Sequence, residues 1–474
     1  MRLPGSSIGI PACDESVMIE KRTQYHLQIP DPVLYCMEVL SMSGCEAWLV
    51  GGSVRDLCMG RTPTDYDLTT DATPEAIQML FSDRKTLDSG MKHGTVTVIV
   101  DGKPVEITTY RTEGAYSDGR RPDYVEFTPS LEKDLVRRDF TINTLVLNDK
   151  GILLDYTGGL DDIRNGLIRC VGDASDRFRE DALRVIRALR FASVLGFTIE
   201  PETSAALSAQ ASLLRHIAAE RIWTEFTGLL CGGFVRPILE DYADIFAIII
   251  PEIPAMRNFD QRNPYHKYDV WAHTIRVVEG VPPEKVIRLA ALFHDVGKPA
   301  TFTLDTDGIG HFYGHDAEGA RMASEILLRM KCDTRTRTSV EELIRIHCVP
   351  ISPDEKTVKR RLNQYGAETI HRLIDLKIAD AKAQSELSAD RIAPLLETRE
   401  AVRDCVARAD CFSIKSLAID GADLIQIGMK EGPEIGKLLE DLLQKVICGE
   451  VKNDRTALLG YVISEKEVGS DTIV

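Results

Sequence analysis

The front part of the chain alternates apolar and polar residues in short runs that predict β-strands. Residues 95–100 and 104–110 are rich in Val, Ile and Thr, and they flank the dipeptide Asp101-Gly102. Two such runs joined by Asp-Gly predict a tight hairpin. Another short apolar run at residues 46–50 predicts a further strand. We therefore expect a mixed sheet with helices over residues 25–165.

From about residue 166 onward the apolar spacing becomes helical. Residues 177–195 carry apolar side chains every three residues and stop at Gly196, a typical helix end. Residues 203–231 predict two more helices, and the rest of the chain is also predicted to be helical. The fold class is thus α+β. We expect five segments: a loose leader (1–24), the mixed head (25–165), a helical neck (166–255), a helical body (256–395) and a helical tail (396–474).

Length and composition predict the number of domains, the cellular location and the state of the cysteines. A length of 474 residues predicts about three compact domains, and 44% apolar residues can fill their cores. The chain lacks an apolar run that could serve as a signal peptide or cross a bilayer, so we expect a cytoplasmic protein without a membrane partner. Eleven cysteines without CxxC pairs indicate reduced, mostly packed thiols rather than a disulfide framework or zinc finger.

The charge balance is acidic, with a formal net charge of −16. Contacts to nucleic-acid phosphates usually need a basic face. One stretch could supply it locally, because the segment 177–190 holds five arginines (177, 179, 184, 187 and 190). An exposed helix face is the alternative interpretation of this run.

The strongest chemical signal is a pair of carboxylates, Asp65 and Asp67, two positions apart. In a strand such residues point to one face. Carboxylates together with substrate phosphates are the usual ligands of Mg²⁺. Glu106, in the run 104–110, is placed to act as a third catalytic carboxylate, or else is a polar residue on a half-exposed strand.

Just upstream lies Gly51-Gly52-Ser53-Val54-Arg55-Asp56. The glycines allow backbone to approach an anion closely. We expect a short helix from Val54 to Met59, opened by Ser53 and ended by Gly60, whose N-terminus could face a phosphate. Arg55 would add a charged donor. Triphosphate on one side and metal on the other is the arrangement of a nucleotidyl-transfer site.

These residues resemble a known family, the polymerase-β-like tRNA nucleotidyltransferases of class II (CCA-adding enzymes) and the related bacterial poly(A) polymerases. The resemblance rests on residues 49–56 and 63–68 and continues in Arg137-Arg138-Asp139-Phe140-Thr141-Ile142-Asn143. It implies that Arg137, Arg138 and Asn143 help to bind the nucleotide and that Asp139 selects ribose. The family usually continues Ala-Met after the asparagine, where this chain has Thr144-Leu145.

A third motif, Glu180-Asp181-Ala182-Leu183-Arg184, has an acid and a guanidinium three residues apart, on one face if the segment is helical. A carboxylate that accepts and a guanidinium that donates match the pairing edges of cytosine and adenine but not those of guanine and uracil. The alternative is an ordinary intrahelical ion pair. The resemblance implies that Asp181 and Arg184 act as a protein template for the incoming base, with Glu180 orienting Arg184 and with Arg187 and Arg190 also near the nucleotide.

Two further features belong to this resemblance. Residues 113–124 contain Gly and Pro and correspond to a flexible element that helps the family switch from C to A addition. Seven of the ten histidines fall between positions 266 and 371. Their order resembles the HD phosphohydrolase pattern on a helical bundle. It implies a divalent metal (Mn, Fe, Ni, Zn or Mg) held by His273, His294, Asp295, His315, His347 and Asp380, with Lys298 near a phosphate.

The sequence therefore predicts an enzyme that adds C, C and A to tRNA from CTP and ATP with Mg²⁺, followed by an HD domain that could repair damaged 3′ ends. A poly(A) polymerase or an A-adding tRNA nucleotidyltransferase is the first alternative. A phosphohydrolase whose head only binds RNA is the second, and a plain helical scaffold is the third. Oligomeric state, the activity of the HD site and its metal, and the way addition stops are not encoded in these patterns.

Overall fold

The computed structural model describes residues 21–24, 28–114 and 124–470. The chain forms two compact units, the first made of residues 1–192 and 196–217 and the second of residues 193–195 and 218–474. Most of the predicted flexible element, residues 115–123, lies outside the described residues. One correction concerns the leader, because residues 21–24 form a strand instead of continuing a loose segment.

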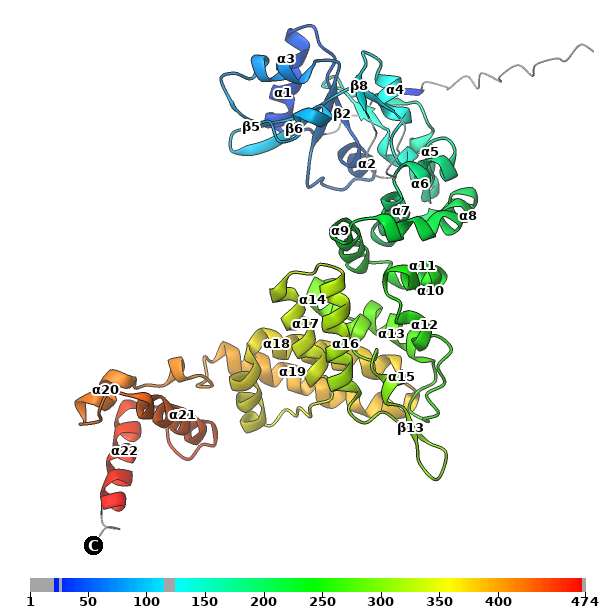
Figure 1. Ribbon diagram of the computed structural model, residues 1–474. Helices are drawn as coiled ribbons and strands as arrows, with labels where there is room; N and C mark the ends of the chain where they lie inside the picture. The colour runs from blue at the N-terminus through cyan, green and yellow to red at the C-terminus, as the bar shows by residue number, and fades with distance from the viewer. Residues whose placement is uncertain (1–20, 25–27, 115–123, 471–474) are drawn as a thin grey trace, which may run out of the picture. The chain divides into compact units, whose positions relative to one another are not determined.

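The first unit is built on a mixed eight-stranded sheet (Figure 1). Only β3 and β6 pair in parallel, and the other neighbours are antiparallel. The strands, in spatial order, are β1 (Lys21–Gln24), β10 (Ile152–Asp155), β9 (Val146–Leu147), β2 (Trp48–Val50), β3 (Asp67–Thr70), β6 (Lys103–Thr109), β5 (Thr95–Val100) and β4 (Lys85–Leu87).

The predicted hairpin is confirmed as β5 and β6. Its turn residues Asp101 and Gly102 have φ values of 51° and 76°, the left-handed pair that a two-residue hairpin turn requires. Burial alternates along β5, and its inward side chains join the core beneath helices α1 (Asp31–Met42) and α3 (Pro74–Leu80). This packing fixes the register, because a shift by one residue would expose the buried valines.

The first unit contains further helices and two small strand pairs. They are helices α2 (Gly52–Cys58), α4 (Leu131–Val136), α5 (Gly159–Asn165), α6 (Ala174–Glu180), α7 (Leu183–Leu195, whose last three residues belong to the second unit) and α8 (Pro201–Gln210), and the strand pairs β7 (Arg111–Glu113) with β8 (Val125–Phe127) and β11 (Leu167–Ile168) with β12 (Thr198–Ile199).

The described part of the second unit is helical apart from one small hairpin, β13 (Thr303–Leu304) and β14 (Gly310–His311). Its helices appear from green to red in Figure 1. They are α9 (Ala219–Leu230), α10 (Val235–Asp241), α11 (Ala243–Ile249), α12 (Ile253–Met256), α13 (Val270–Gly280), α14 (Lys285–Phe293), α15 (Lys298–Thr301), α16 (His315–Arg329), α17 (Thr334–Ile346), α18 (Glu355–Ala383), α19 (Ile392–Ala407), α20 (Gly421–Gln426), α21 (Pro433–Ile447) and α22 (Arg455–Ser470).

The predicted class, a mixed sheet followed by helices, is confirmed. The division between the two units falls inside the predicted neck, residues 166–255, so that neck is not one compact body. Within the described ranges, none of the helices combines the length and the apolar character needed to cross a membrane.

Candidate functional site

Three carboxylates line one pocket at the start of β3. Asp67 is the first residue of that strand and is paired in parallel register with Glu106 of β6. Both line a pocket of about 610 Å³ together with Asp65. The prediction that Asp65 and Asp67 share the face of one strand is wrong, because Asp65 lies in the loop before β3. The parallel neighbour strand supplies Glu106 instead.

The charges in this pocket act on one another. The pKa of Asp67 is raised to about 6, first by partial desolvation and then by the carboxylates of Glu106 and Asp65, although its side chain reaches solvent. The charge of Arg138 opposes this rise. Crowded carboxylates gain when a cation is shared between them. The pocket is therefore suited to a hard divalent metal ion.

The turn into α2 brings backbone close to this arginine. Gly51 has φ 77°, a conformation that favours glycine, and a Cβ there would lie 3.7 Å from Nη1 of Arg138. The prediction that Ser53 opens the helix is wrong. Gly51 precedes the helix, and the Ser53 hydroxyl donates to the carbonyl of Val50 at 3.0 Å. Gly51 offers no capping side chain, so the first N–H groups of α2 are not capped by it.

A residue that the sequence analysis missed, Asp134, holds both arginines of the second motif. Its side chain is fully buried in α4. One oxygen accepts from Arg137 Nη2 at 2.6 Å, and the other accepts from Arg138 Nη2 at 3.1 Å. Burial would raise the pKa of Asp134, but the two guanidinium groups hold it below its ordinary value. Spacings of three and four residues on a helix were the signal that could have revealed this pairing.

Replacing Asp134 by alanine is expected to lower the free energy of unfolding by about 3 kcal/mol, because two partly buried arginines lose their shared counter-charge. Urea unfolding followed by circular dichroism measures this loss. The matched control is Asp176→Ala, which removes an exposed ion pair with Arg179 and should cost below about 1 kcal/mol. Equal losses in the two variants would show that the buried carboxylate has no special role.

Asp139 lies at the centre of a second hydrogen-bond network. Its Oδ1 accepts from Asn143 Nδ2 at 3.1 Å, and its Oδ2 accepts from Arg187 Nε at 2.5 Å. Asn143 in turn accepts from Arg55 at 2.9 Å. Burial would raise the pKa of Asp139, but Arg187 and the hydrogen bond from Asn143 hold it below its ordinary value. Arg55 also forms an ion pair with Asp56. This nearly buried arginine therefore connects Asp56 to the hydrogen-bond network of Asp139 through Asn143.

Phe191 is a second residue that the sequence analysis missed. The guanidinium carbons of Arg55, Arg187 and Arg190 lie 5.1, 5.4 and 4.5 Å from the centre of its ring. The ring is buried and also meets Phe140 edge to face. Cations over an aromatic face are attracted to it. Phe191 therefore gathers three of the predicted nucleotide-binding arginines.

The helix predicted over residues 177–195 is broken near its start. α6 ends at Glu180, α7 begins at Leu183, and Asp181 between them has extended backbone with φ −141° and ψ 102°. Asp181 and Arg184 therefore do not share a face of one helix, contrary to the prediction. The Oδ1 atom of Asp181 accepts from the backbone N–H of Leu183 at 3.1 Å, in the manner of an Asx turn.

Arg184 connects this break to the second motif. Its Nη1 donates to Glu180 at 2.6 Å, which confirms the predicted contact between these two residues. Its Nη2 donates to the backbone carbonyl of Arg137 at 3.2 Å. The neighbouring Arg138 acts on Asp67. Within the first unit, the α6–α7 break is therefore hydrogen-bonded to the second motif, and a charge of that motif acts on the carboxylate pocket.

In the second unit the structure brings together the predicted metal-ligating residues. His273 Nε2 lies 3.0 Å from Asp380 Oδ1, and His294 Nε2 lies 3.2 Å from Asp295 Oδ2. The other carboxylate oxygen of Asp295 lies 3.7 Å from His315 Nε2. Burial would lower the pKa of His294, but Asp295 and Asp380 raise it above its ordinary value. The cluster therefore favours a positive charge at its centre.

Lys298 lies at the edge of this cluster. Its ammonium group is 2.7 Å from Asp295 Oδ2 and donates to Gln261 Oε1 at 2.9 Å. All three side chains are buried. In this arrangement the lysine neutralises the aspartate, a role different from the phosphate contact that the sequence suggested.

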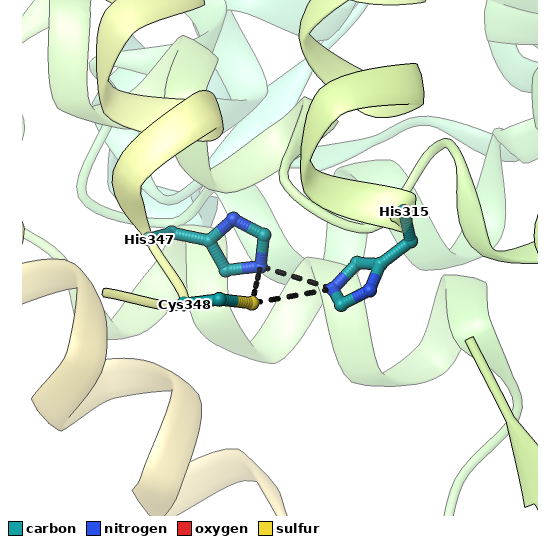
Figure 2. A group of neighbouring side chains, drawn as sticks. All are labelled: His315, His347 and Cys348. Carbon is teal, nitrogen blue, oxygen red and sulfur yellow. Dashed lines mark hydrogen bonds between the residues drawn. The ribbon is translucent and has the colours of Figure 1, made fainter. Parts of the chain in front are cut away.

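A third missed residue, Cys348, lies beside two histidines of this cluster, His315 and His347 (Figure 2). We call these two the outer histidines, and His273 and His294 the inner histidines. Its Sγ is 3.4 Å from His347 Nε2 and 3.7 Å from His315 Nε2, and these two nitrogens are 3.2 Å apart. The three side chains converge from α16 and from the end of α17. Adjacency to His347 in the sequence was the available signal, but the cysteines were interpreted together as packed thiols.

Three family models match successive parts of the chain. The poly A polymerase head domain matches residues 47–169, the probable RNA and SrmB-binding site of polymerase A matches residues 196–256, and the putative domain 2 of tRNA nucleotidyltransferases matches residues 317–462. The third match runs across the predicted limit between body and tail at residue 395.

Relatives and solved structures agree with these matches. The CCA-adding enzyme of Levilactobacillus brevis is 33% identical over 90% of this chain and 96% of its own length, and that of Lactobacillus johnsonii is 35% identical over 90% and 95%. The Bacillus stearothermophilus CCA-adding enzyme in complex with CTP has a TM-score of 0.67 at 28% identity, covering 94% of this chain and all of that one. The Thermotoga maritima CCA-adding enzyme complexed with tRNA shares the fold, with a TM-score of 0.53 at 19% identity over 91% and 94% of the two chains. This chain belongs to the family of CCA-adding enzymes.

Proposed function

We propose that this protein adds C, C and A to the 3′ end of tRNA, using CTP and ATP. The observation that carries the proposal is the pocket lined by Asp65, Asp67 and Glu106, together with the charge of Arg138, a residue of the arginine motif, which acts on Asp67. The CCA-adding enzyme of L. brevis, which is 33% identical across 90% of this chain, supports the choice of reaction.

The carboxylate pocket fits Mg²⁺. Its carboxylates offer hard oxygens, and two of them, on Asp67 and Glu106, come from neighbouring positions of paired strands. Asp65 and Asp67 would hold the metal, and Glu106 would add a third carboxylate. A bound metal pair would supply charge to activate the RNA 3′-hydroxyl and to stabilise the leaving pyrophosphate.

The residues around this pocket position the nucleotide. Arg137 and Arg138, held by Asp134, would neutralise the triphosphate beside the Gly51-Gly52 turn. Asp139, fixed by Asn143 and Arg187, would accept from the ribose hydroxyl groups. Each of these side chains is oriented by a hydrogen bond that is already formed, which lowers the cost of ordering the site when substrate binds.

Asp181 and Arg184 would read the base. A carboxylate acceptor beside a guanidinium donor complements cytosine and adenine, and a site of this kind leaves polar groups unpaired when guanine or uracil enters. The break between α6 and α7 supports this role, because the extended backbone at Asp181 places its carboxylate outside the helical ladder. Glu180 keeps the guanidinium of Arg184 in place.

The experiment that tests the proposal offers CTP and ATP, separately and together, to tRNA that lacks its 3′ end, and sequences the products. The proposal expects two C residues with CTP alone and C, C, A with both nucleotides. Addition of A without C would favour the A-adding enzyme, and a long A tail would favour the poly(A) polymerase.

A second function is proposed for the helical unit, namely a metal-dependent phosphohydrolase that restores a free 3′-hydroxyl on damaged RNA. The Nε2 atoms of His273 and His294 are buried and make no hydrogen bond, although carboxylate oxygens lie 3.0 and 3.2 Å away. The Nδ1 atom of His294 contacts the carbonyl of Ala291 at 2.8 Å, which assigns its proton to Nδ1 and leaves a lone pair on Nε2. A lone pair facing a carboxylate fits a shared divalent cation.

Alanine at both His294 and Asp295 is expected to abolish phosphodiesterase activity on RNA ending in a 2′,3′-cyclic phosphate and to leave nucleotide addition within about twofold, because the ligands of the two sites belong to different compact units. Alanine at Asp305 and His311, an exposed ion pair, is the matched control and should change neither activity. Loss of both activities in the first variant alone would contradict two independent sites.

A further inference from the structure

We propose that His315, His347 and Cys348 form a zinc site of their own, with Cys348 bound as the thiolate. The inference deepens the second proposed function and rests on it in one respect, since both histidines belong to the cluster assigned there. It adds a sulfur ligand, and this ligand favours zinc over harder metal ions.

The first argument comes from the protons on the two imidazole rings. Nδ1 of His315 lies 2.7 Å from the carbonyl of Phe312, and Nδ1 of His347 lies 2.6 Å from the carbonyl of Ile344. A carbonyl only accepts, so each Nδ1 carries the proton and each Nε2 exposes a lone pair. These two Nε2 atoms are 3.2 Å apart and face each other. Two lone pairs at this distance repel unless a cation lies between them.

The second argument is the shape of the triangle. Zinc–nitrogen bonds of about 2.0–2.1 Å and zinc–sulfur bonds of about 2.3 Å in a tetrahedron place two nitrogens about 3.3 Å apart and a nitrogen and a sulfur about 3.6 Å apart. The observed edges are 3.2 Å between the nitrogens and 3.4 and 3.7 Å from Cys348 Sγ to them. The three atoms therefore have the spacing of three corners of a tetrahedral zinc site (Figure 2).

The third argument concerns the surroundings. Asp295 Oδ1 lies 3.7 Å from His315 Nε2, while Oδ2 of the same residue lies 3.5 Å from His273 Nε2 and 3.2 Å from His294 Nε2. Asp295 would thus offer one carboxylate oxygen to the proposed zinc site and the other to the metal site of His273 and His294. Cys348 is exposed, so a metal ion reaches the site from solution.

The sulfur ligand selects the metal. Thiolate and imidazole suit zinc, whereas hard cations such as Mg²⁺ prefer oxygen. Binding breaks the S–H bond of Cys348, forms the metal–sulfur bond and releases the proton to water. The inner group, with carboxylates from Asp295 and Asp380, accepts harder ions, so the two halves of the cluster would differ in metal preference.

Cobalt(II) titrated into the metal-free full chain tests this inference. A thiolate bound to cobalt gives a strong sulfur-to-metal charge-transfer band in the near ultraviolet, which nitrogen and oxygen ligands do not give. We expect this band in the natural protein and its loss in Cys348→Ser, while the weaker visible bands of cobalt on the inner histidines remain. Zn²⁺ affinity in that variant should fall by more than the roughly 10–100-fold that outer-shell partners contribute.

The control is Cys231→Ser, because Cys231 belongs to no metal-ligating group found among the described residues, and it should keep the band. Cobalt binding to the natural protein without the band would overturn the role of Cys348 and leave the second proposed function intact. A band that persists in Cys348→Ser would also overturn it. No cobalt binding at all would remove both proposals together.

Discussion

Asparagine at both Asp65 and Asp67 is expected to reduce nucleotide addition by at least about 10³-fold. The exchange keeps the shape of the side chains but removes the two charges that would hold Mg²⁺ in the pocket with Glu106. Single-turnover addition of C to truncated tRNA measures the rate, and binding of CTP without metal measures whether the rest of the site is intact. We expect the rate to collapse and the metal-free binding to persist.

The matched control for this variant is Asp88→Asn, an exposed carboxylate that does not line the pocket. It should retain the natural rate within about twofold. Addition at the natural rate by the Asp65 and Asp67 variant would remove the catalytic role of the pocket. It would then favour a head that binds RNA without acting on it.

Alanine at Asp181 and Arg184 is expected to remove most of the discrimination between the correct and the wrong bases, which in a hydrogen-bonded site reaches roughly 10⁴. The variant should incorporate UTP and GTP at rates close to its rates with CTP and ATP, because no buried polar group is then left unpaired by the wrong base. Competition between the four nucleotides for one truncated tRNA, followed by product sequencing, measures the ratio.

Arg184 also touches the backbone of Arg137, so its removal could disturb the triphosphate region. Asp181→Asn separates the two effects, because Asp181 lies outside that contact and the amide keeps the side-chain size. It should change base selection while leaving the affinity for inorganic triphosphate unchanged. The control Arg179→Ala removes an arginine paired with Asp176 on the exposed side of α6. If neither Asp181→Asn nor the double alanine variant of Asp181 and Arg184 changed base selectivity, a protein template at this position would be rejected.

Part of the fold of the head, residues 25–165, was predictable from local sequence patterns. The β5–β6 hairpin was predictable because its turn and its alternation are both encoded within a few residues. The parallel pairing that puts Glu106 beside Asp67 was not, because it joins segments separated by 39 positions along the chain, as the register shows. Only the residue types suggested that these carboxylates meet.

The errors have physical causes. Residues 177–195 have helical spacing throughout, yet the helix breaks at Asp181, whose side chain competes for a backbone N–H as aspartates do. Ser53 resembled a cap, but glycine at position 51 makes the turn and the hydroxyl satisfies Val50 instead. The roles of Phe191 and Cys348 depend on side chains brought together by tertiary packing, whereas the pairing of Asp134 with Arg137 and Arg138 is local and was predictable from their spacing.

The central claim is that the acidic pair Asp65 and Asp67 and the base-reading pair Asp181 and Arg184 serve one bound nucleotide. A crystal structure of the protein with CTP and Mg²⁺ tests it most directly. The account predicts metal and triphosphate at Asp65 and Asp67, with the cytosine amino group and ring nitrogen within hydrogen-bond distance of Asp181 and Arg184. Triphosphate in the pocket with the base directed away from both of these residues would contradict it.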